Sequence, residues 1–205
     1  MAEFDFDDTR TRLVPVLPLR EAALFPEATL VQIVARPSHL RALEVAARSG
    51  GQLLALGHRE TGPLPLQARD FHGVGTLARV TDDVALPDET RRVELDGVRR
   101  ARVLTLALGD AFLAEIEPLD EGETGDEWGP AVEALARYLH AHAELRSFLD
   151  QQRRSTDPMA WVNLACQHLP ITASARQKLL DSPAADRCQR ISRGLDALLK
   201  KEKGD

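Results

Sequence analysis

The sequence contains little lysine, cysteine or aromatic side chain. Only four of its 26 basic residues are lysines, and all four lie in the last 30 residues. Chemistry that needs a lysine within the first 170 residues is therefore excluded. Because no lysine follows a glycine anywhere in the chain, the lysine of an ATPase phosphate-binding loop is also missing. Two cysteines in 205 residues are too few for a disulfide scaffold.

Long apolar runs and an excess of positive charge are missing as well. No run approaches about 18 apolar residues, which argues against a membrane-spanning helix. Residues 1–12 are acidic and lack the apolar stretch of a secretory signal. The net charge of −6 disfavours nucleic acid as a partner, since proteins that bind its backbone usually carry a basic surface. We expect a cytoplasmic protein without membrane contact.

What is present is an ordinary globular composition, 43% hydrophobic and 28% charged, divided by one acidic stretch. Residues 120–127 are mostly acidic and contain two glycines, as expected of a linker or exposed loop. Apolar runs before this stretch are short, whereas those after it have helical spacing. We therefore predict a strand-rich domain at 10–119 and a helical domain at 127–203.

Seven short strands, interrupted by one helix, are predicted in the first domain. Short apolar runs bounded by proline and glycine are typical of a small barrel or sandwich. Ser38 is predicted to cap the helix, and Gly50-Gly51 to end it. The predicted strands are 13–19, 30–34, 52–56, 73–80, 92–96, 101–108 and 112–117.

The second domain is predicted to be a bundle of helices. Apolar residues at three- and four-residue spacing predict one helix from Pro130 to Gln152. Asp157 and Thr172 are predicted N-caps of the next two helices, since their side-chain oxygens can accept from free backbone N–H groups. Ser182-Pro183 opens the last helix.

A glycine motif at 73–78 matches the G-x-G-x-x-A pattern of dinucleotide-binding folds. In those folds a crossover helix follows the glycines. Here Thr81, Asp82 and Asp83 come too soon for such a helix. We interpret the two glycines as flanking a strand or a bulge, and no nucleotide cofactor is expected.

The metal-ligating residue types lack the spacing of a metal site. Cys166, His168 and Cys188 are single rather than paired, so both cysteines are predicted to pack as small apolar residues in the helical core. His140 and His142 are two residues apart on a predicted helix and therefore point to different sides. We expect His140 to be exposed and His142 to be half-buried, with no metal bound.

Catalytic patterns are equally weak. Ser174 and Lys178 are four residues apart, a spacing that would suit a nucleophile and its base, but their short helix is highly charged and predicts a surface pair. The G-x-S-x-G pattern of serine hydrolases is missing. We predict no catalytic residue, while an enzyme with a spatially assembled site remains an alternative.

The conspicuous remaining residues are apolar and lie beside prolines at turns. Phe25 and Pro26 form one such pair, and Leu86 and Pro87 form another. Exposed, these residues would mark a binding surface, whereas buried they would pack beneath a loop. The sequence alone slightly favours burial. All four are nevertheless our predicted peptide-binding residues, because they are apolar and lie at turns.

Several motifs, taken in order, resemble the N-terminal domain of the Lon family of ATP-dependent proteases. The resemblance covers residues 13 to about 200. Glu89 departs from it, because the family commonly has glycine in that turn, and a positive φ would strain glutamate. The motifs are Val16–Arg20, Leu24–Pro26, Gly73–Ala78, Leu86–Asp88, Val93–Val103, Asp157-Pro158, His168–Pro170, Gln177–Leu180 and Arg187.

The resemblance implies an α+β fold, a PUA-like β-barrel with one or two short helices followed by an α-helical bundle. It also implies a non-catalytic, free-standing substrate-binding domain, since the family's ATPase and peptidase domains would follow Asp205. Its expected partners are unfolded or partly folded polypeptides, in protein degradation or quality control. Alternatives are an adaptor on a full-length Lon-type protease, or an RNA-binding module using the arginines at 91–92 and 99–102. Self-association is left open.

Overall fold

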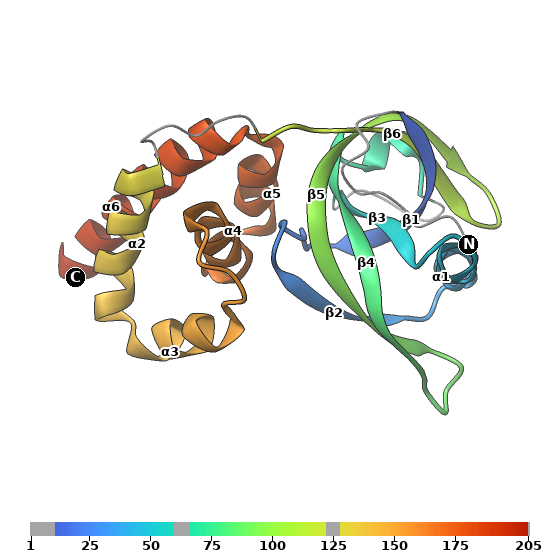
Figure 1. The fold of residues 1–205 in the computed structure, drawn as a ribbon, viewed down its shortest axis with the longest axis horizontal. Coiled ribbons are helices and arrows are strands. Elements are labelled where there is room, and N and C mark those ends of the chain that lie inside the picture. Colours follow the sequence, from blue (N-terminus) through green and yellow to red (C-terminus); the bar gives the residue numbers. More distant parts are fainter. Residues whose placement is uncertain (1–10, 60–65, 122–127, 205) are drawn as a thin grey trace. The chain divides into compact units, whose positions relative to one another are not determined.

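The computed structural model describes residues 11–59, 66–121 and 128–204 (Figure 1). The chain separates into two compact units, Met1–Asp120 and Glu121–Asp205. Every strand in the described residues lies in the first unit and the second is helical, so the α+β class is confirmed. Within the described residues, no helix is long and apolar enough to cross a membrane.

The strand-rich unit contains one mixed sheet in the order β2-β5-β4-β3-β1-β6. Because β6 also pairs with β5, the five strands from β5 round to β6 form a ring, and β2 lies outside it. The β1–β3 pair is parallel and the other pairs are antiparallel. The elements are β1 (Arg12–Arg20), β2 (Thr29–Val34), α1 (Pro37–Arg48), β3 (Gln52–His58), a 3-10 turn (Ala68–Asp70), β4 (Val74–Ala85), β5 (Arg91–Leu108) and β6 (Phe112–Pro118).

Strand β5 differs from the prediction, because two expected strands are one strand of 18 residues. Its register with β4 shifts at Val98, which lies between the pairs Leu77–Arg99 and Ala78–Gly97. Such a bulge bends a strand without ending it, so the first half of β5 pairs with β2 and the second with β6. Gly97 therefore does not end a strand.

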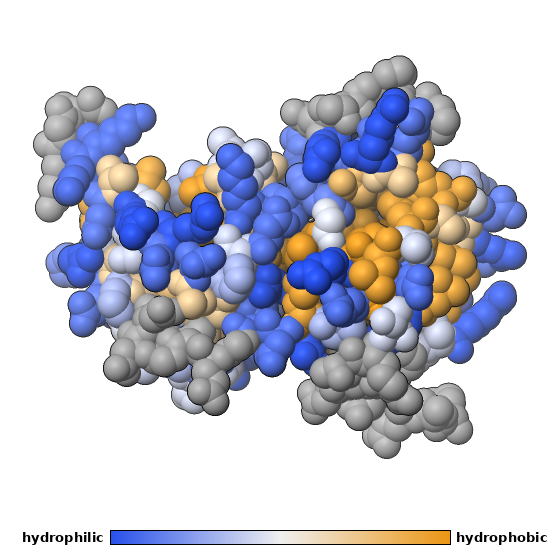
Figure 2. All heavy atoms as spheres, turned by 90° about the horizontal axis from the view of Figure 1, so that it is seen from above, coloured by the Kyte–Doolittle hydropathy of each residue, from blue (hydrophilic) through white to orange (hydrophobic). Residues whose placement is uncertain are grey.

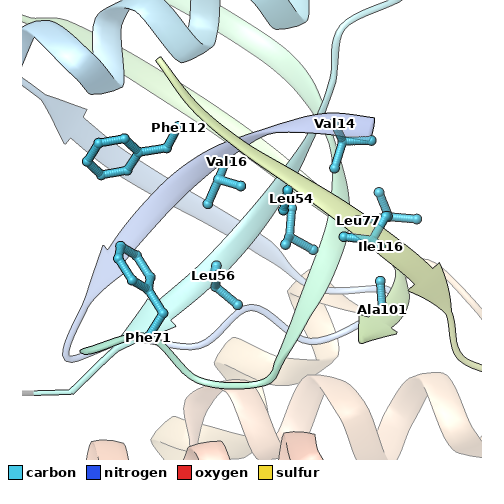
Figure 3. Close-up of a cluster of buried hydrophobic side chains, with 10 residues drawn as sticks. Val14, Val16, Leu54, Leu56, Phe71, Leu77, Ala101, Phe112 and Ile116 are labelled. Carbon is cyan, nitrogen blue, oxygen red and sulfur yellow. The ribbon is translucent and has the colours of Figure 1, made fainter. Parts of the chain in front are cut away.

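Alternate residues of β1, β3 and β6 fill the interior of the ring (Figure 3). Alternation places every second side chain of a strand on the same face, which explains this clean division. Phe71 and Phe112 pack edge to face, with ring centroids 6.1 Å apart. The buried cluster is Val14, Val16, Leu54, Leu56, Phe71, Leu77, Ala101, Phe112, Ala114 and Ile116.

Residues 74–78 of the glycine motif lie in β4, which starts just after Gly73 and continues to Ala85 with no helix after the glycines. The strand interpretation is therefore right. Gly75 is packed so closely that a Cβ there would lie 2.7 Å from the carbonyl oxygen of Ala55. The glycine serves the contact between β4 and β3.

Helix α1 packs on β1 and β3 through its buried residues Ala42, Leu43 and Ala46. The prediction that Ser38 caps it is wrong. Pro37 occupies the first turn, which suits its fixed φ, and Arg36 takes the N-cap position without a side-chain hydrogen bond.

The helical unit contains five helices in its described residues. Two predicted caps are confirmed: the Asp157 carboxylate accepts from the N–H of Met159 at 3.1 Å, and the Thr172 hydroxyl accepts from the N–H of Ala175 at 3.2 Å. The helices are α2 (Trp128–Ala141), α3 (Ala143–Gln152), α4 (Pro158–His168), α5 (Ala173–Asp181) and α6 (Ala184–Gly204).

The single helix predicted from Pro130 to Gln152 is wrong, because it breaks at His142 between α2 and α3. The carbonyl oxygen of Tyr138 accepts from the His142 ring Nδ1 at 2.8 Å, while the backbone N–H of His142 donates to Leu139 instead. A side chain thus takes the acceptor that a continuing helix would offer to the backbone. His142 is half-buried and His140 is exposed, as predicted.

The core of the helical unit contains a buried cation, Arg187. Its guanidinium donates to the Asn163 side-chain oxygen, to the Ser182 carbonyl oxygen at 3.1 Å and to the Glu121 carboxylate at 2.9 Å. Its Nε donates to the carbonyl oxygen of Leu179 at 3.2 Å. Four acceptors satisfy the charge, which allows it to be buried.

Candidate functional site

The tip of the β4–β5 hairpin carries Leu86 and Pro87, two of the predicted peptide-binding residues. The Leu86 N–H donates to the Thr90 carbonyl at 2.8 Å, and the Glu89 N–H donates to the Leu86 carbonyl at 3.2 Å. Glu89 has a φ of 64°. This is the pattern of a short hairpin loop that ends in a left-handed residue. The turn keeps the geometry that favours glycine, although glutamate occupies it.

Thr90 fixes the Asp88 side chain within this loop. The Asp88 carboxylate accepts from the Thr90 hydroxyl at 2.6 Å and from the Thr90 N–H at 3.2 Å. These hydrogen bonds favour the ionised form and lower the pKa of Asp88. Leu86 is half-buried and Pro87 is exposed, so both can be reached at the tip.

Phe25 and Pro26 lie elsewhere, and both are buried. Their turn is held on β5, since the Glu27 N–H donates to the Gly97 carbonyl and the Gly97 N–H donates to the Ala28 carbonyl, both at 2.9 Å. A Cβ at Gly97 would lie 2.1 Å from the Phe25 carbonyl oxygen. The turn therefore closes over the strand, and the two predicted residues offer no surface to a client in this conformation.

Three exposed apolar residues that were not predicted from the sequence lie near the hairpin tip. Val31 and Ile33 on β2 are 48% and 58% exposed, and Val84 on β4 is 44% exposed. Leu86 follows Val84 by two residues, just beyond the end of β4, and adds a half-buried apolar side chain at the tip. We call Val31, Ile33, Val84, Leu86 and Pro87 the hairpin strip.

Strand register places members of the hairpin strip together. Ile33 pairs with Arg92 of β5, and Arg92 pairs with Val84 of β4. Paired residues of antiparallel strands project to one face, so Ile33 and Val84 flank Arg92 at about two strand spacings, roughly 10 Å apart. Val31 projects to this same face, because it is two residues from Ile33.

The charges within this face are largely paired with one another. The Arg92 guanidinium lies 2.8 Å from the Asp82 carboxylate and 3.9 Å from the Glu94 carboxylate. Such exposed ion pairs contribute little stability. They do hold the guanidinium of Arg92 over Asp82. The methylene groups of Arg92 therefore lie between Ile33 and Val84 and add further apolar surface there.

Strand β2 is an edge of the sheet. Among the described strands it pairs only with β5. Its six residues, Thr29–Val34, include no charge and no proline, the devices that usually protect an edge from pairing with another chain. An edge of this kind can accept an extended peptide as an added strand, with main-chain hydrogen bonds and pockets for alternate side chains.

A second apolar area lies on the outer face of β1 and β5. Leu13 is 65% exposed and Leu104 is 47% exposed. Figure 2 shows broad apolar surface on the strand-rich unit. Leu13 is paired with β6 and Leu104 lies in a β5 segment that also pairs with β6, so neither is on a free strand edge. This area therefore offers apolar side chains to a client, but no free backbone groups with which an added strand could pair.

The arginine clusters that suggested RNA are engaged within the protein. Arg100 is buried, and Arg99 donates to the Leu119 carbonyl at 3.0 Å. Arg102 lies 2.9 Å from the Glu117 carboxylate, and Arg91 lies 2.7 Å from that of Asp83. Most of this charge is therefore neutralised locally, which leaves little to attract phosphate.

The sequence motifs of the helical unit do not assemble into a site in the described residues. Ser174 and Lys178 are both exposed on α5. Cys166 and Cys188 are buried as predicted, and burial raises the pKa of the Cys166 thiol to about 12. No group of three or more His, Cys, Asp or Glu in the described ranges could hold a metal ion. Most of the acidic stretch, 122–127, lies outside these ranges.

The chain matches known proteins over nearly its whole length. A family model described as the ATP-dependent protease La (LON) substrate-binding domain matches residues 13–198. Lon protease 1 of Thermus thermophilus is 30% identical over 196 residues, which are 91% of this chain and 24% of that protein. Lon protease of Haemophilus influenzae is 29% identical over 177 residues, which are 83% of this chain and 22% of that protein. The chain thus spans less than a quarter of these relatives.

Two solved structures share the fold. The N-terminal domain of a Mycobacterium avium complex Lon protease has a TM-score of 0.73 at 21% identity and covers 90% of this chain and 98% of its own. A Lon N-terminal domain protein from Xanthomonas campestris has a TM-score of 0.62 at 22% identity, over 88% of this chain and 96% of its own. With the match over residues 13–198, they lead to one conclusion: the chain belongs to the family of Lon substrate-binding domains.

Proposed function

We propose that the chain binds exposed apolar segments of unfolded or partly folded polypeptides, without catalysing a reaction itself, in the service of protein degradation. The observation that carries this proposal is the uncharged edge strand β2, with Val31 and Ile33 exposed beside the β4–β5 hairpin. Membership of a substrate-binding family supports it.

In the proposed complex, an extended client segment lies along β2. Its backbone N–H and C=O groups pair with the free edge, and every second side chain faces the hairpin strip. Burial of those side chains against Ile33, Val84 and Leu86 contributes about 25 cal/mol for each Å² removed from water, before the cost of ordering the client. Main-chain pairing tolerates many sequences, which suits a receptor for unfolded chains.

A binding assay with matched variants tests this proposal. Fluorescence anisotropy would follow a fluorescein-labelled, reduced and carboxymethylated lactalbumin, which cannot refold. The triple variant V31T/I33T/V84T removes apolar surface while keeping β-branched strand formers, so the sheet should persist. We expect affinity to fall at least about tenfold, equivalent to about 1.4 kcal/mol. Circular dichroism checks the fold.

The double variant L13T/L104T is the control, because it removes apolar surface from the second area, away from the free edge. It should bind like the unaltered protein. Equal losses in the two variants would indicate nonspecific apolar adhesion, and no loss in the triple variant would exclude the hairpin strip. L86A/P87A tests the tip alone and should weaken binding less.

A full-length Lon-type protease is the second proposed partner, supported by the match to Lon proteases of two bacteria. Adding such a protease to the anisotropy assay separates two roles. A receptor for clients binds lactalbumin without the protease. An adaptor binds the protease itself, which pull-down with purified components would detect.

A further inference from the structure

The helical unit contains a groove that the proposed function does not use. It lies between α5 and α6, with a volume of about 500 Å³. Its floor is apolar and comes from Leu179 of α5 and from Ile191, Leu195 and Leu198 of α6. Ile171, from the turn before α5, adds a half-buried apolar side chain. A groove of this size accommodates a few side chains of a ligand rather than a whole helix.

The charged residues that line this groove are all basic. They are Lys178 on α5 and Arg190 and Arg193 on α6, and all three are exposed. No lining residue is acidic, although the chain as a whole has a net charge of −6. Positive charge on both walls of an apolar groove favours a ligand with carboxylates beside its apolar side chains.

Gly194 lies in the wall of the groove, inside α6. Glycine in a helix interior is less favourable than alanine by about 1 kcal/mol. Neither packing nor backbone conformation requires it, since a Cβ there would meet no atom within 4 Å and its φ is not positive. Because Gly194 has no side chain, the wall of the groove has a gap there. This gap lies one helical turn from Arg190 on one side and one turn from Leu198 on the other.

We propose that this groove binds an acidic amphipathic helix of a partner polypeptide. Leucine-like side chains at helical spacing would enter over Leu179, Ile191 and Leu195, and flanking carboxylates would pair with Lys178, Arg190 and Arg193. A helix laid in a groove is a general mode of peptide recognition. A basic segment is rejected, because it brings like charges together on both walls. This groove and the hairpin strip lie in different units. The groove would bind a helical, acidic ligand, whereas the hairpin strip would bind an extended, apolar one.

A pair of synthetic peptides tests the charge preference. Both have leucines at positions i, i+3, i+4 and i+7, and they differ only in glutamate or lysine at the flanking positions. By anisotropy, the glutamate peptide should bind at least about tenfold more tightly than the lysine peptide. Its affinity should fall as salt rises from about 0.05 to 0.5 M, because the paired charges are exposed. Equal binding of both peptides, or none, would overturn the proposal.

Gly194 provides a matched pair of variants for the same assay. Gly194→Leu places a large side chain in the groove and should weaken the glutamate peptide at least about tenfold, while leucine forms helix better than glycine and so keeps α6 folded. Gly194→Ala gives the same helical gain with one methyl group and should bind the peptide like the unaltered protein. The proposal fails if Gly194→Leu binds the glutamate peptide normally.

The two sites are separated by crossing the variants and the probes. V31T/I33T/V84T should still bind the glutamate peptide with unchanged affinity, and Gly194→Leu should still bind unfolded lactalbumin with unchanged affinity. Loss of both ligands in Gly194→Leu would contradict a separate groove, whereas failure of the hairpin strip alone leaves the groove result standing. The charge-reversed variant R190E/R193E should favour the lysine peptide instead.

Discussion

The two units fill their interiors in different ways. The strand-rich unit buries apolar side chains inside a ring of strands, and the backbone at Gly75 and Gly97 is packed so closely that a Cβ would not fit. The helical unit also buries apolar side chains, but its interior includes a charge, Arg187, with four hydrogen-bond acceptors. Arg100 is also buried in the strand-rich unit, so the contrast lies between the close backbone approach at its glycines and the hydrogen bonds around Arg187. Substitutions that act on one of these should leave the other unit intact.

The largest expected effect comes from removing the buried cation. Arg187→Met should lower the free energy of unfolding of the helical unit by about 3–5 kcal/mol, because Glu121 and Asn163 lose their donor. Both tryptophans, Trp128 and Trp161, lie in this unit, so tryptophan fluorescence during urea unfolding follows it specifically. A loss below about 1 kcal/mol would mean that packing, not hydrogen bonding, dominates there.

The corresponding change in the strand-rich unit is Gly97→Ala. The added methyl group would meet the Phe25 carbonyl at 2.1 Å, so the turn over β5 must move, at a cost of about 1–3 kcal/mol. Circular dichroism should report this loss while tryptophan fluorescence keeps its midpoint. Gly73→Ala is the control, since a Cβ there meets nothing within 4 Å. Equal effects of the two substitutions would argue against close packing at Gly97.

A smaller, pH-dependent difference is expected from His39 in α1. Burial, with Arg36 and His58 nearby, lowers its pKa from 6.5 to about 4. The folded state therefore protonates His39 less readily than the unfolded chain does. The contribution of His39 to the free energy of unfolding is accordingly highest above pH 6.5, and it falls as the pH drops towards 4. His39→Phe keeps the edge contact with Phe112 and should flatten this dependence in the strand-rich unit. Identical pH profiles would contradict this origin.

The smallest expected effect is a gain. Glu89→Gly removes the strain of a positive φ at the hairpin tip and should stabilise the strand-rich unit by about 0.5–1 kcal/mol. Glu89→Ala is the control, because it keeps the Cβ that causes the strain and should bring no such gain. If alanine stabilised as much as glycine, the strain would lie in the glutamate side chain and not in the backbone.

Several features decided by neighbouring residues were predictable from the sequence, although the cap of α1 and the break at His142 were not. Asp157 and Thr172 cap their helices because both partners of each cap lie within three residues. The turn predicted at Leu86 and Pro87 depends on neighbouring residues in the same way, and the structure places it at the tip of the β4–β5 hairpin. The strand interpretation of Gly75 was right because the residues after it could not form a helix.

Features decided by distant contacts were not predictable. Gly97 resembles a strand end, yet it is required by a turn some 70 residues earlier in the chain. The sequence favours burial of Phe25 only slightly, and the contact of its turn with β5 decides the matter. Apolar residues lie on both faces of β2, a pattern that is also typical of a fully buried strand. That Val31 and Ile33 are exposed depends on β2 having a single neighbour, and only the sheet order reveals this.

The closure of the strand ring has a consequence for synthesis on the ribosome. The first residues of β1 pair with β6, and Arg12 meets Ile116 only after about a hundred further residues have been joined. Contacts so distant in sequence form slowly. Until β6 emerges, Leu13 and its neighbours lack that partner strand, so the nascent chain itself exposes an apolar strand of the kind that a receptor for unfolded polypeptides recognises.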